Sequence, residues 1–150
     1  MGYNAKLPVS LGVVKLGGLF AKLNNYNFVL FMKRVLIIDD DEAILEVTKM
    51  ALEMHAFEVS TLVSTDDAYD AINNFRPDVI LLDYNIGDEG NGRKFCNTIK
   101  LDPSLKHIKV IMFSALIYDD LDFSKPMFKC FDNYVPKPYD IDYLIEKVSK

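Results

Sequence analysis

The chain has 150 residues, and 50% of them are hydrophobic, which is enough material for one ordinary globular core. No window is long enough and free enough of charge to cross a bilayer, so we expect no transmembrane segment. The formal net charge is -5, from 17 basic and 22 acidic residues. Direct binding of nucleic acid is therefore not expected, and a metal ion or a cationic partner is favoured.

The two cysteines point to the cellular compartment. Cys96 and Cys130 have neither the number nor the spacing of a disulfide framework or a zinc site. This pattern suits a reducing compartment, so we expect a cytoplasmic protein. Each cysteine is expected to be a small buried apolar residue.

Residues 1–31 differ in charge from the rest of the chain. They contain three lysines and no acid, which leaves 14 basic and 22 acidic side chains in residues 32–150. The shift predicts a boundary near Met32. We favour the explanation that Met32 is the true start of translation and that the preceding stretch is a mis-assigned upstream region. A disordered or interfacial extension, with lysines flanking apolar residues, stays open as the alternative.

Five short apolar runs alternate with helical patterns from Val35 onward. The predicted strands cover residues 35–38, 57–60, 79–82, 110–113 and 134–135. The first, third and fourth are apolar at every position, like central strands buried on both faces, whereas the second alternates like an edge strand. This pattern predicts a doubly wound α/β fold: a five-stranded parallel sheet of order 2-1-3-4-5 with helices on both faces.

Apolar residues at helical spacing predict helices over 44–52, 68–75 and 141–148. The first of these follows Asp41. The second has Ser64 or Thr65 as its N-cap and is closed by Pro77.

Two further helices are less regular in the sequence. A short helix is expected around Phe95 and Ile99, after a glycine-rich turn. Between Leu116 and Phe131 we expect a short or irregular helix, because Pro126 removes a backbone donor and clashes with the preceding turn.

Polar side chains follow four of the predicted strands, where open α/β sheets bind ligands. In chain order they are Asp39, Asp40 and Asp41, then Asp83, then Ser114, then Lys137. Each alone has a simple structural explanation as a helix cap or a loop residue. Together they would place like charges about 4 Å apart, which costs roughly 4 kcal/mol at an effective dielectric constant near 20.

A hard divalent cation would relieve this repulsion. Mg²⁺ is usually held by one or two carboxylates together with waters and phosphate oxygens, and Mn²⁺ is an alternative ion. Asp40 and Asp83 are the candidate direct ligands, Asp39 is a candidate ligand through water, and the backbone carbonyl of Asn85 is a candidate further ligand.

With these residues in place, the sequence resembles the receiver domain of two-component response regulators. Residues 35–40 resemble the family's acidic-pair strand, and residues 78–83 its phosphoacceptor strand. Residues 110–115 are similar to its hydroxyl-bearing strand, and 134–138 to its aromatic and Lys-Pro ending. The four blocks stand in the family's order, and the resemblance covers residues 32–150.

The resemblance implies a flavodoxin-like fold and a phosphoacceptor role for Asp83. The phosphoryl group would come from a phosphohistidine of a histidine kinase or of a histidine phosphotransfer protein. Lys137 and Mg²⁺ would neutralise the phosphoryl oxygens, Ser114 would hydrogen-bond to them, and Tyr134 would be the aromatic switch. The resemblance thus implies that the protein is a stand-alone phosphorelay switch that acts on an unknown downstream protein. It does not imply an enzyme with a separate substrate.

Two other classes of protein are weighed against this one. An aspartyl-phosphate phosphatase needs an acid two residues after its nucleophile, where this chain has Asn85. A docking module that is never phosphorylated has no use for the repelling carboxylates.

The chain also departs from the receiver pattern at Gly87, which replaces a proline, and at Cys130-Phe131, which replace small residues, so we expect an unusual output surface.

Overall fold

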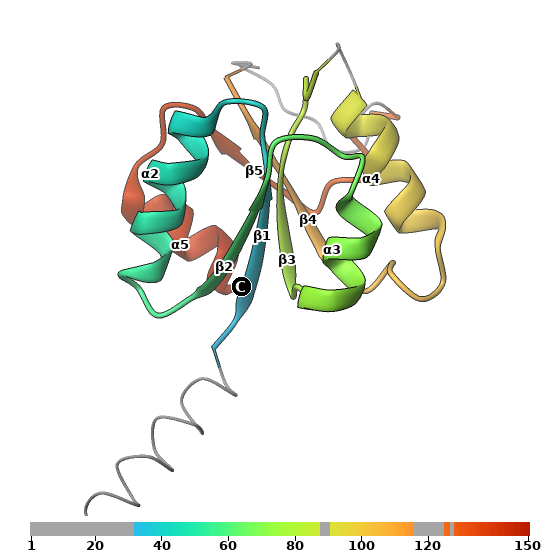
Figure 1. Ribbon diagram of the computed structural model, residues 1–150. Coiled ribbons are helices and arrows are strands. Elements are labelled where there is room, and N and C mark those ends of the chain that lie inside the picture. The colour runs from blue at the N-terminus through green and yellow to red at the C-terminus, as the bar shows by residue number, and fades with distance from the viewer. Residues whose placement is uncertain (1–31, 88–90, 116–124, 127) are drawn as a thin grey trace, which may run out of the picture. The chain divides into compact units, whose positions relative to one another are not determined.

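The computed structural model describes residues 32–87, 91–115, 125–126 and 128–150 (Figure 1). Its strands form one parallel sheet of order β2-β1-β3-β4-β5, which confirms the predicted fold class and strand order. The strands are β1 (Arg34–Ile38), β2 (Glu58–Leu62), β3 (Val79–Asp83), β4 (Lys109–Ser114) and β5 (Asn133–Pro136).

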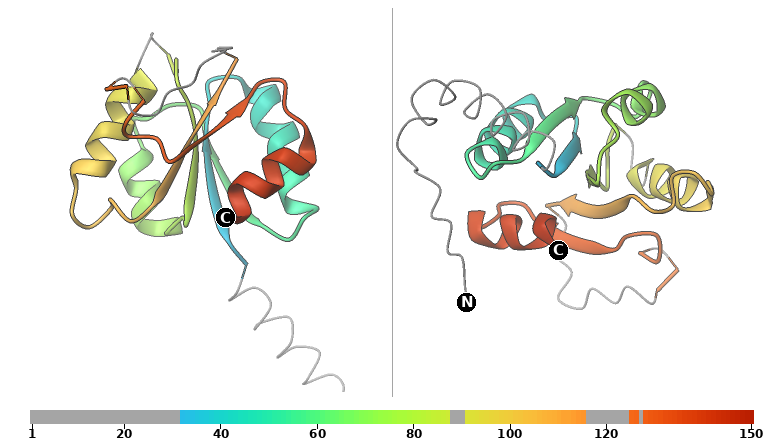
Figure 2. Two further views of the ribbon diagram at one scale, coloured as in Figure 1. Left: turned by 180° about the vertical axis from the view of Figure 1, so that it is seen from behind. Right: turned by 90° about the horizontal axis from the view of Figure 1, so that it is seen from below.

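Four helices cover the sheet within the described residues. They are α2 (Glu42–Glu53), α3 (Ala68–Phe75), α4 (Asn91–Leu101) and α5 (Ile141–Ser149). Figures 1 and 2 show α2 and α5 on one face of the sheet and α3 and α4 on the other. No helix in the described part of the chain has the length and hydropathy needed to cross a membrane.

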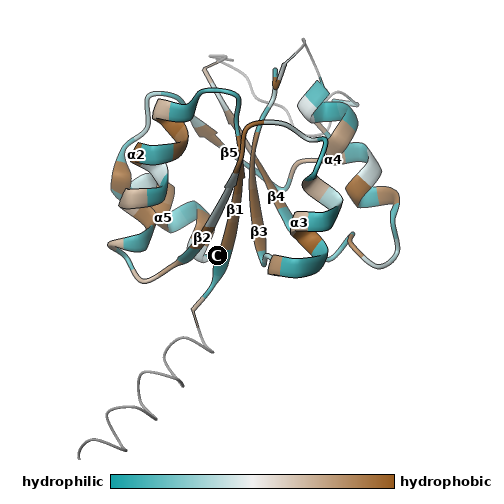
Figure 3. Cartoon of the chain, in the orientation of Figure 1, coloured by the Kyte–Doolittle hydropathy of each residue, from teal (hydrophilic) through white to brown (hydrophobic). Residues whose placement is uncertain are grey.

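Successive side chains of the central strands point to opposite faces of the sheet and so contribute to two hydrophobic cores, one on each face. Leu36 and Ile80 face the core under α3 and α4, whereas Ile37 and Leu81 face the core under α2 and α5. All four side chains are fully buried. Figure 3 shows the result, with hydrophobic residues along β1 and β3 and polar residues on the outer faces of the helices. Cys96 and Cys130 are buried and unpaired, as predicted.

The start of α2 follows the sequence pattern, and the start of α3 does not. The carboxylate of Asp41 accepts hydrogen bonds from the backbone N–H groups of Ala43 and Ile44 and so caps α2. The prediction of Ser64 or Thr65 as the N-cap of α3 was wrong, because residues 64–67 form a bend followed by a turn and the helix begins at Ala68 behind Asp67.

Most elements run one or two residues beyond their predicted bounds, and β2 and α4 differ further from the sequence prediction. Strand β2 begins at Glu58 and not at Phe57, whose backbone N–H instead donates to the Leu52 carbonyl at the end of α2. Helix α4 has 11 residues and is longer than expected. In the predicted irregular helix, residues 116–124 and 127 lie outside the described part, and the described residues around Pro126 form turns.

Candidate functional site

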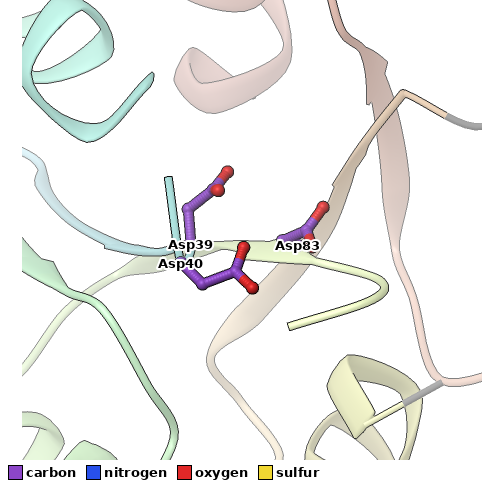
Figure 4. Close-up of side chains that lie close together, drawn as sticks. All are labelled: Asp39, Asp40 and Asp83. Carbon is purple, nitrogen blue, oxygen red and sulfur yellow. The ribbon is translucent and has the colours of Figure 1, made fainter. Parts of the chain in front are cut away.

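Four parallel strands end at one edge of the sheet, and this edge carries the predicted site residues. Asp39 follows β1, Asp83 is the last residue of β3, Ser114 is the last residue of β4, and Lys137 follows β5. Because β1, β3, β4 and β5 are successive neighbours in the sheet, these residues lie along one crevice. Figure 4 shows Asp39 and Asp40 beside Asp83.

The three aspartates form a compact group of hard oxygen ligands. One carboxylate oxygen from each of Asp39, Asp40 and Asp83 lies within 4.8 Å of the other two. Asp39 is 1% exposed and Asp83 is 7% exposed, whereas Asp40 is open to solvent. Two buried carboxylates and one accessible carboxylate fit a hard divalent cation that enters from solvent and keeps some of its waters.

Lys137 supplies the positive charge inside this group. Its ammonium forms ion pairs with Asp39 and with Asp83, where the distance from Nζ to Oδ1 is 3.1 Å. The ammonium also lies 4.8 Å from the centre of the Phe113 ring, a cation–π distance. Lys137 is therefore held from two sides and bridges the ends of β1 and β3.

Burial shifts the protonation of Asp83. Desolvation raises the pKa of its carboxyl group above the ordinary value of 3.8, and the negative charge of Asp39 adds to this. The positive charge of Lys137 and hydrogen bonds from Lys137 and the Asn85 backbone act in the opposite direction but do not cancel the shift. Without a cation, Asp83 therefore holds its proton more strongly than a solvated aspartate does.

The loop after β3 fixes the carboxylates with backbone donors. The N–H of Asn85 donates to Oδ2 of Asp83 at 3.1 Å, and the N–H of Gly87 donates to Oδ2 of Asp40 at 3.1 Å. Gly87 has a φ of +70°, a conformation that favours glycine. The glycine that replaces the family's proline thus lets the loop reach back to the end of β1.

Gly92 is a positioning residue that the sequence analysis missed. A Cβ atom at this position would lie 1.9 Å from the carbonyl oxygen of Asp83. Because this oxygen belongs to the backbone, no change of side-chain rotamer could relieve the clash. The N–H of Gly92 also donates to the Tyr84 carbonyl at 3.1 Å. The first turn of α4 therefore rests directly on the backbone of the Asp83 loop.

Ser114 and Tyr134 are linked to each other beside the crevice. Ser114 is 2% exposed, and its carbonyl oxygen accepts a hydrogen bond from Oη of Tyr134 at 3.4 Å. Tyr134 is half-buried and packs against the core under α3 and α4. The tyrosine side chain is thus tied to the end of β4.

Comparison with known proteins assigns the family. Residues 35–149 match the family model of the response regulator receiver domain. The chain belongs to this family. Receiver domains are components of two-component signalling, in which they work with histidine kinases.

The curated relatives of this receiver domain are longer proteins. The DNA-binding dual master transcriptional regulator RpaA of Synechocystis sp. is 31% identical over 120 residues, which cover 78% of this chain and 48% of the relative. The phosphate regulon transcriptional regulatory protein PhoB of Klebsiella pneumoniae is 27% identical over 117 residues, which cover 78% of this chain and 50% of the relative. The chain spans about half the length of the curated relatives it matches.

Solved receiver domains share the fold. A CheY-like response regulator receiver domain protein from Methanospirillum hungatei is 32% identical with a TM-score of 0.64, over 79% of this chain and 91% of that chain. The response regulator TrrA from Thermotoga maritima, in complex with Mg²⁺-BeF, is 28% identical with a TM-score of 0.67, over 79% of this chain and 97% of that chain.

Proposed function

We propose that Asp83 is the phosphoacceptor of a cytoplasmic phosphorelay switch and takes a phosphoryl group from a phosphohistidine of a histidine kinase or histidine phosphotransfer protein. One observation carries this proposal. In this receiver domain, the carboxylate of Asp83 is nearly buried. It lies beside two further carboxylates and within hydrogen-bond distance of the Lys137 ammonium. A carboxylate nucleophile, a cation site and a fixed positive charge are the parts that phosphoryl transfer needs.

The transfer exchanges one bond to phosphorus for another. A carboxylate oxygen of Asp83 attacks the phosphorus atom, the bond from phosphorus to the imidazole nitrogen breaks, and the donor leaves as neutral histidine after it takes up a proton. The product is an acyl phosphate. Hydrogen bonds from Asn85 and Lys137 to the two Asp83 oxygens orient the nucleophile before the donor arrives.

Mg²⁺ is the proposed cofactor, with Mn²⁺ as a substitute, and Asp39, Asp40, Asp83 and the backbone carbonyl of Asn85 would hold it. When bound, the ion supplies charge neutralisation for the phosphoryl oxygens. The complex of the Thermotoga maritima relative with Mg²⁺-BeF supports this proposal.

Lys137, Ser114 and Tyr134 carry the response to phosphorylation. Lys137 exchanges its contact with the Asp83 carboxylate for the new phosphoryl oxygens, and the Ser114 hydroxyl donates a hydrogen bond to them. Since Tyr134 is hydrogen-bonded to the Ser114 carbonyl, a shift of Ser114 changes the position preferred by the tyrosine ring.

The output of the switch is a change in protein–protein interaction with a downstream protein. The chain transfers the phosphoryl group to itself and is not an enzyme with a separate substrate. RpaA is named as a DNA-binding regulator. The net charge of -5 argues against direct binding of nucleic acid by this chain.

Acetyl phosphate and intact-protein mass spectrometry test the proposal. With Mg²⁺ we expect one phosphoryl group on the wild-type protein and on Asp70→Asn, a matched substitution on the exposed face of α3. We expect none on Asp83→Asn and none when EDTA replaces Mg²⁺. An adduct on Asp83→Asn would move the acceptor elsewhere, and an unmodified wild-type protein would favour a docking module.

A further inference from the structure

A groove on the surface of α4 is lined by positive charge. Two cavities of about 480 Å³ and 350 Å³ lie between α4 and residues 125, 126, 129 and 130, and both are lined by Asn97 and Pro126. The two cavities therefore adjoin and form one groove, which we call the α4 groove. Figure 2 shows the segment that leads into β5, in orange-red, beside α4. The cations that line the groove are Arg93, Lys94, Lys100, Lys125 and Lys129.

The charge of the α4 groove is opposite to that of the molecule. The chain has a net charge of -5, yet the described lining residues of both cavities include no carboxylate. Lys100 forms an ion pair with Asp132 at 2.6 Å, but the other four cations have no carboxylate partner among the described residues. Like charges that line one groove repel each other, and a bound anion would relieve this repulsion.

The cations form two rails with different origins. On α4 they stand at positions 93, 94 and 100, so they follow one side of the helix over two turns. The second rail, Lys125 and Lys129, comes from the segment before β5. An elongated anion with several negative charges fits this arrangement better than one small ion does.

Apolar surface accompanies the charge. Leu101 is 82% exposed at the end of α4 and lines the groove together with Pro126, which is also exposed. A ligand that covers the whole groove must therefore offer apolar groups beside its negative charges. Aspartate or glutamate residues interspersed with leucine or phenylalanine meet both requirements.

We propose that the α4 groove binds an acidic segment of a partner protein that carries apolar residues between its carboxylates. A nucleic acid strand fits less well. The described lining residues of the groove offer no aromatic side chain on which a base would stack. Residues 32–150 carry 14 basic against 22 acidic side chains, so the rest of the domain would repel a long polyanion.

The site is separate from the phosphorylation chemistry, because none of its lining residues is a proposed ligand or catalytic group at Asp83. Its test uses the full chain and a short fluorescein-labelled peptide of alternating Asp, Glu and Leu, followed by fluorescence anisotropy at low ionic strength. We expect saturable binding that Asp83→Asn leaves unchanged. Failure here would leave the phosphoacceptor proposal untouched.

The decisive variant reverses one charge on each rail. Arg93→Glu/Lys129→Glu should weaken peptide binding at least about tenfold, since each reversal replaces an attraction by a repulsion. The control Lys49→Glu/Lys150→Glu makes the same change in net charge on α2 and the C-terminus and should bind like wild type. Circular dichroism melting confirms that both variants are folded.

Three outcomes would overturn the proposal. The first is an equal loss of affinity in both double variants, which would show a response to net charge alone. The second is equal binding of a peptide in which Asn and Gln replace Asp and Glu. The third is an oligothymidylate that binds more tightly than the peptide and displaces it, which would make the groove a nucleic acid site.

Discussion

At the scale of single residues, burial of Asp83 makes the cation-free site a source of instability at neutral pH. Because its pKa is raised in the folded state, the folded protein binds this proton more tightly than the unfolded chain does. The stabilising effect of that proton is present below the ordinary pKa of 3.8 and is lost as the pH rises through the raised value. At pH 7 the ionised carboxylate therefore works against folding.

The variant Asp83→Asn should consequently be more stable than wild type in the absence of divalent ions. We expect a gain of about 1 kcal/mol in the free energy of unfolding at pH 7. This gain shrinks as the pH falls below the raised pKa of Asp83 and the wild-type carboxyl group becomes protonated. Urea denaturation in EDTA at several pH values measures it, with Asp70→Asn as the control. Addition of Mg²⁺ should reverse the order, because the ion stabilises only the wild-type carboxylate cluster. Equal stabilities in EDTA at every pH would contradict this account.

In the proposed mechanism, Lys137 competes with the cation for the same oxygens and then assists the reaction. Lys137→Ala should therefore slow phosphorylation by acetyl phosphate about 10²-fold, the usual effect of removing one preorganised donor. Mg²⁺ affinity, measured by calorimetry, should be retained or increased, because no ammonium holds Asp39 and Asp83. Lys147→Ala on α5 controls for the loss of a lysine. A phosphorylation rate within twofold of wild type would remove Lys137 from the mechanism.

The sequence identifies the polar members of this site but not the groups that hold them. Asp39, Asp83 and Ser114 could be found because each ends an apolar run. Gly92 could not be found, since its contact with the Asp83 carbonyl depends on how α4 docks. Phe113 reads as a core strand residue, and only the pairing of β4 with β5 brings its ring under Lys137.

At the scale of elements, α2 presents an apolar surface next to the crevice. Val47 is 61% exposed on α2, and it lines a cavity of about 410 Å³ that also contacts Lys137, Pro138 and Ile141. The polar site and this apolar surface share Lys137. A protein donor that reaches Asp83 can therefore bury α2, whereas a small phosphodonor does not need to.

Val47→Asp should separate the two kinds of donor. We expect transfer from a phosphohistidine protein to slow about tenfold, because a charge would be buried in the apolar contact. Phosphorylation by acetyl phosphate should not change. Met54→Asp, at the far end of the same helix and 82% exposed, should leave both rates unaltered. The prediction fails if Val47→Asp slows both donors equally.

Element boundaries were predictable where one local signal was decisive. The apolar runs predicted β1, β3 and β4, and Asp41 was followed by α2 as expected. For α3 the local signals competed, and the bend and turn at 64–67 displaced the start of the helix. Helix α4 is only sparsely apolar and has a glycine at its second residue, so its length depends on packing over β3 and β4 that the sequence does not display.

At the scale of the whole molecule, the two hydrophobic cores that the described residues form draw on side chains from Val35 to Val148. The family match begins at Val35 as well. The composition boundary near Met32 remains a prediction of the sequence.

A chain that starts at Met32 should therefore keep the stability and the chemistry of the full chain. We expect its thermal midpoint to lie within about 2 °C of the full-length value, because no described core contact is lost. The rate of phosphorylation by acetyl phosphate should be the same. Differential scanning calorimetry and the phosphorylation assay check this. A fall of many degrees would show that residues 1–31 contribute to the folded domain.

The contact at Gly92 has a mechanical consequence. Where a helix rests on a sheet through side chains, rotamer changes absorb small movements, but here main chain meets main chain. The joint between the Asp83 loop and α4 is therefore stiff, so a movement of the end of β3 would be passed on to α4. Arg93 and Lys94 follow this joint directly, so displacement of the strand would alter the spacing of the two charged rails.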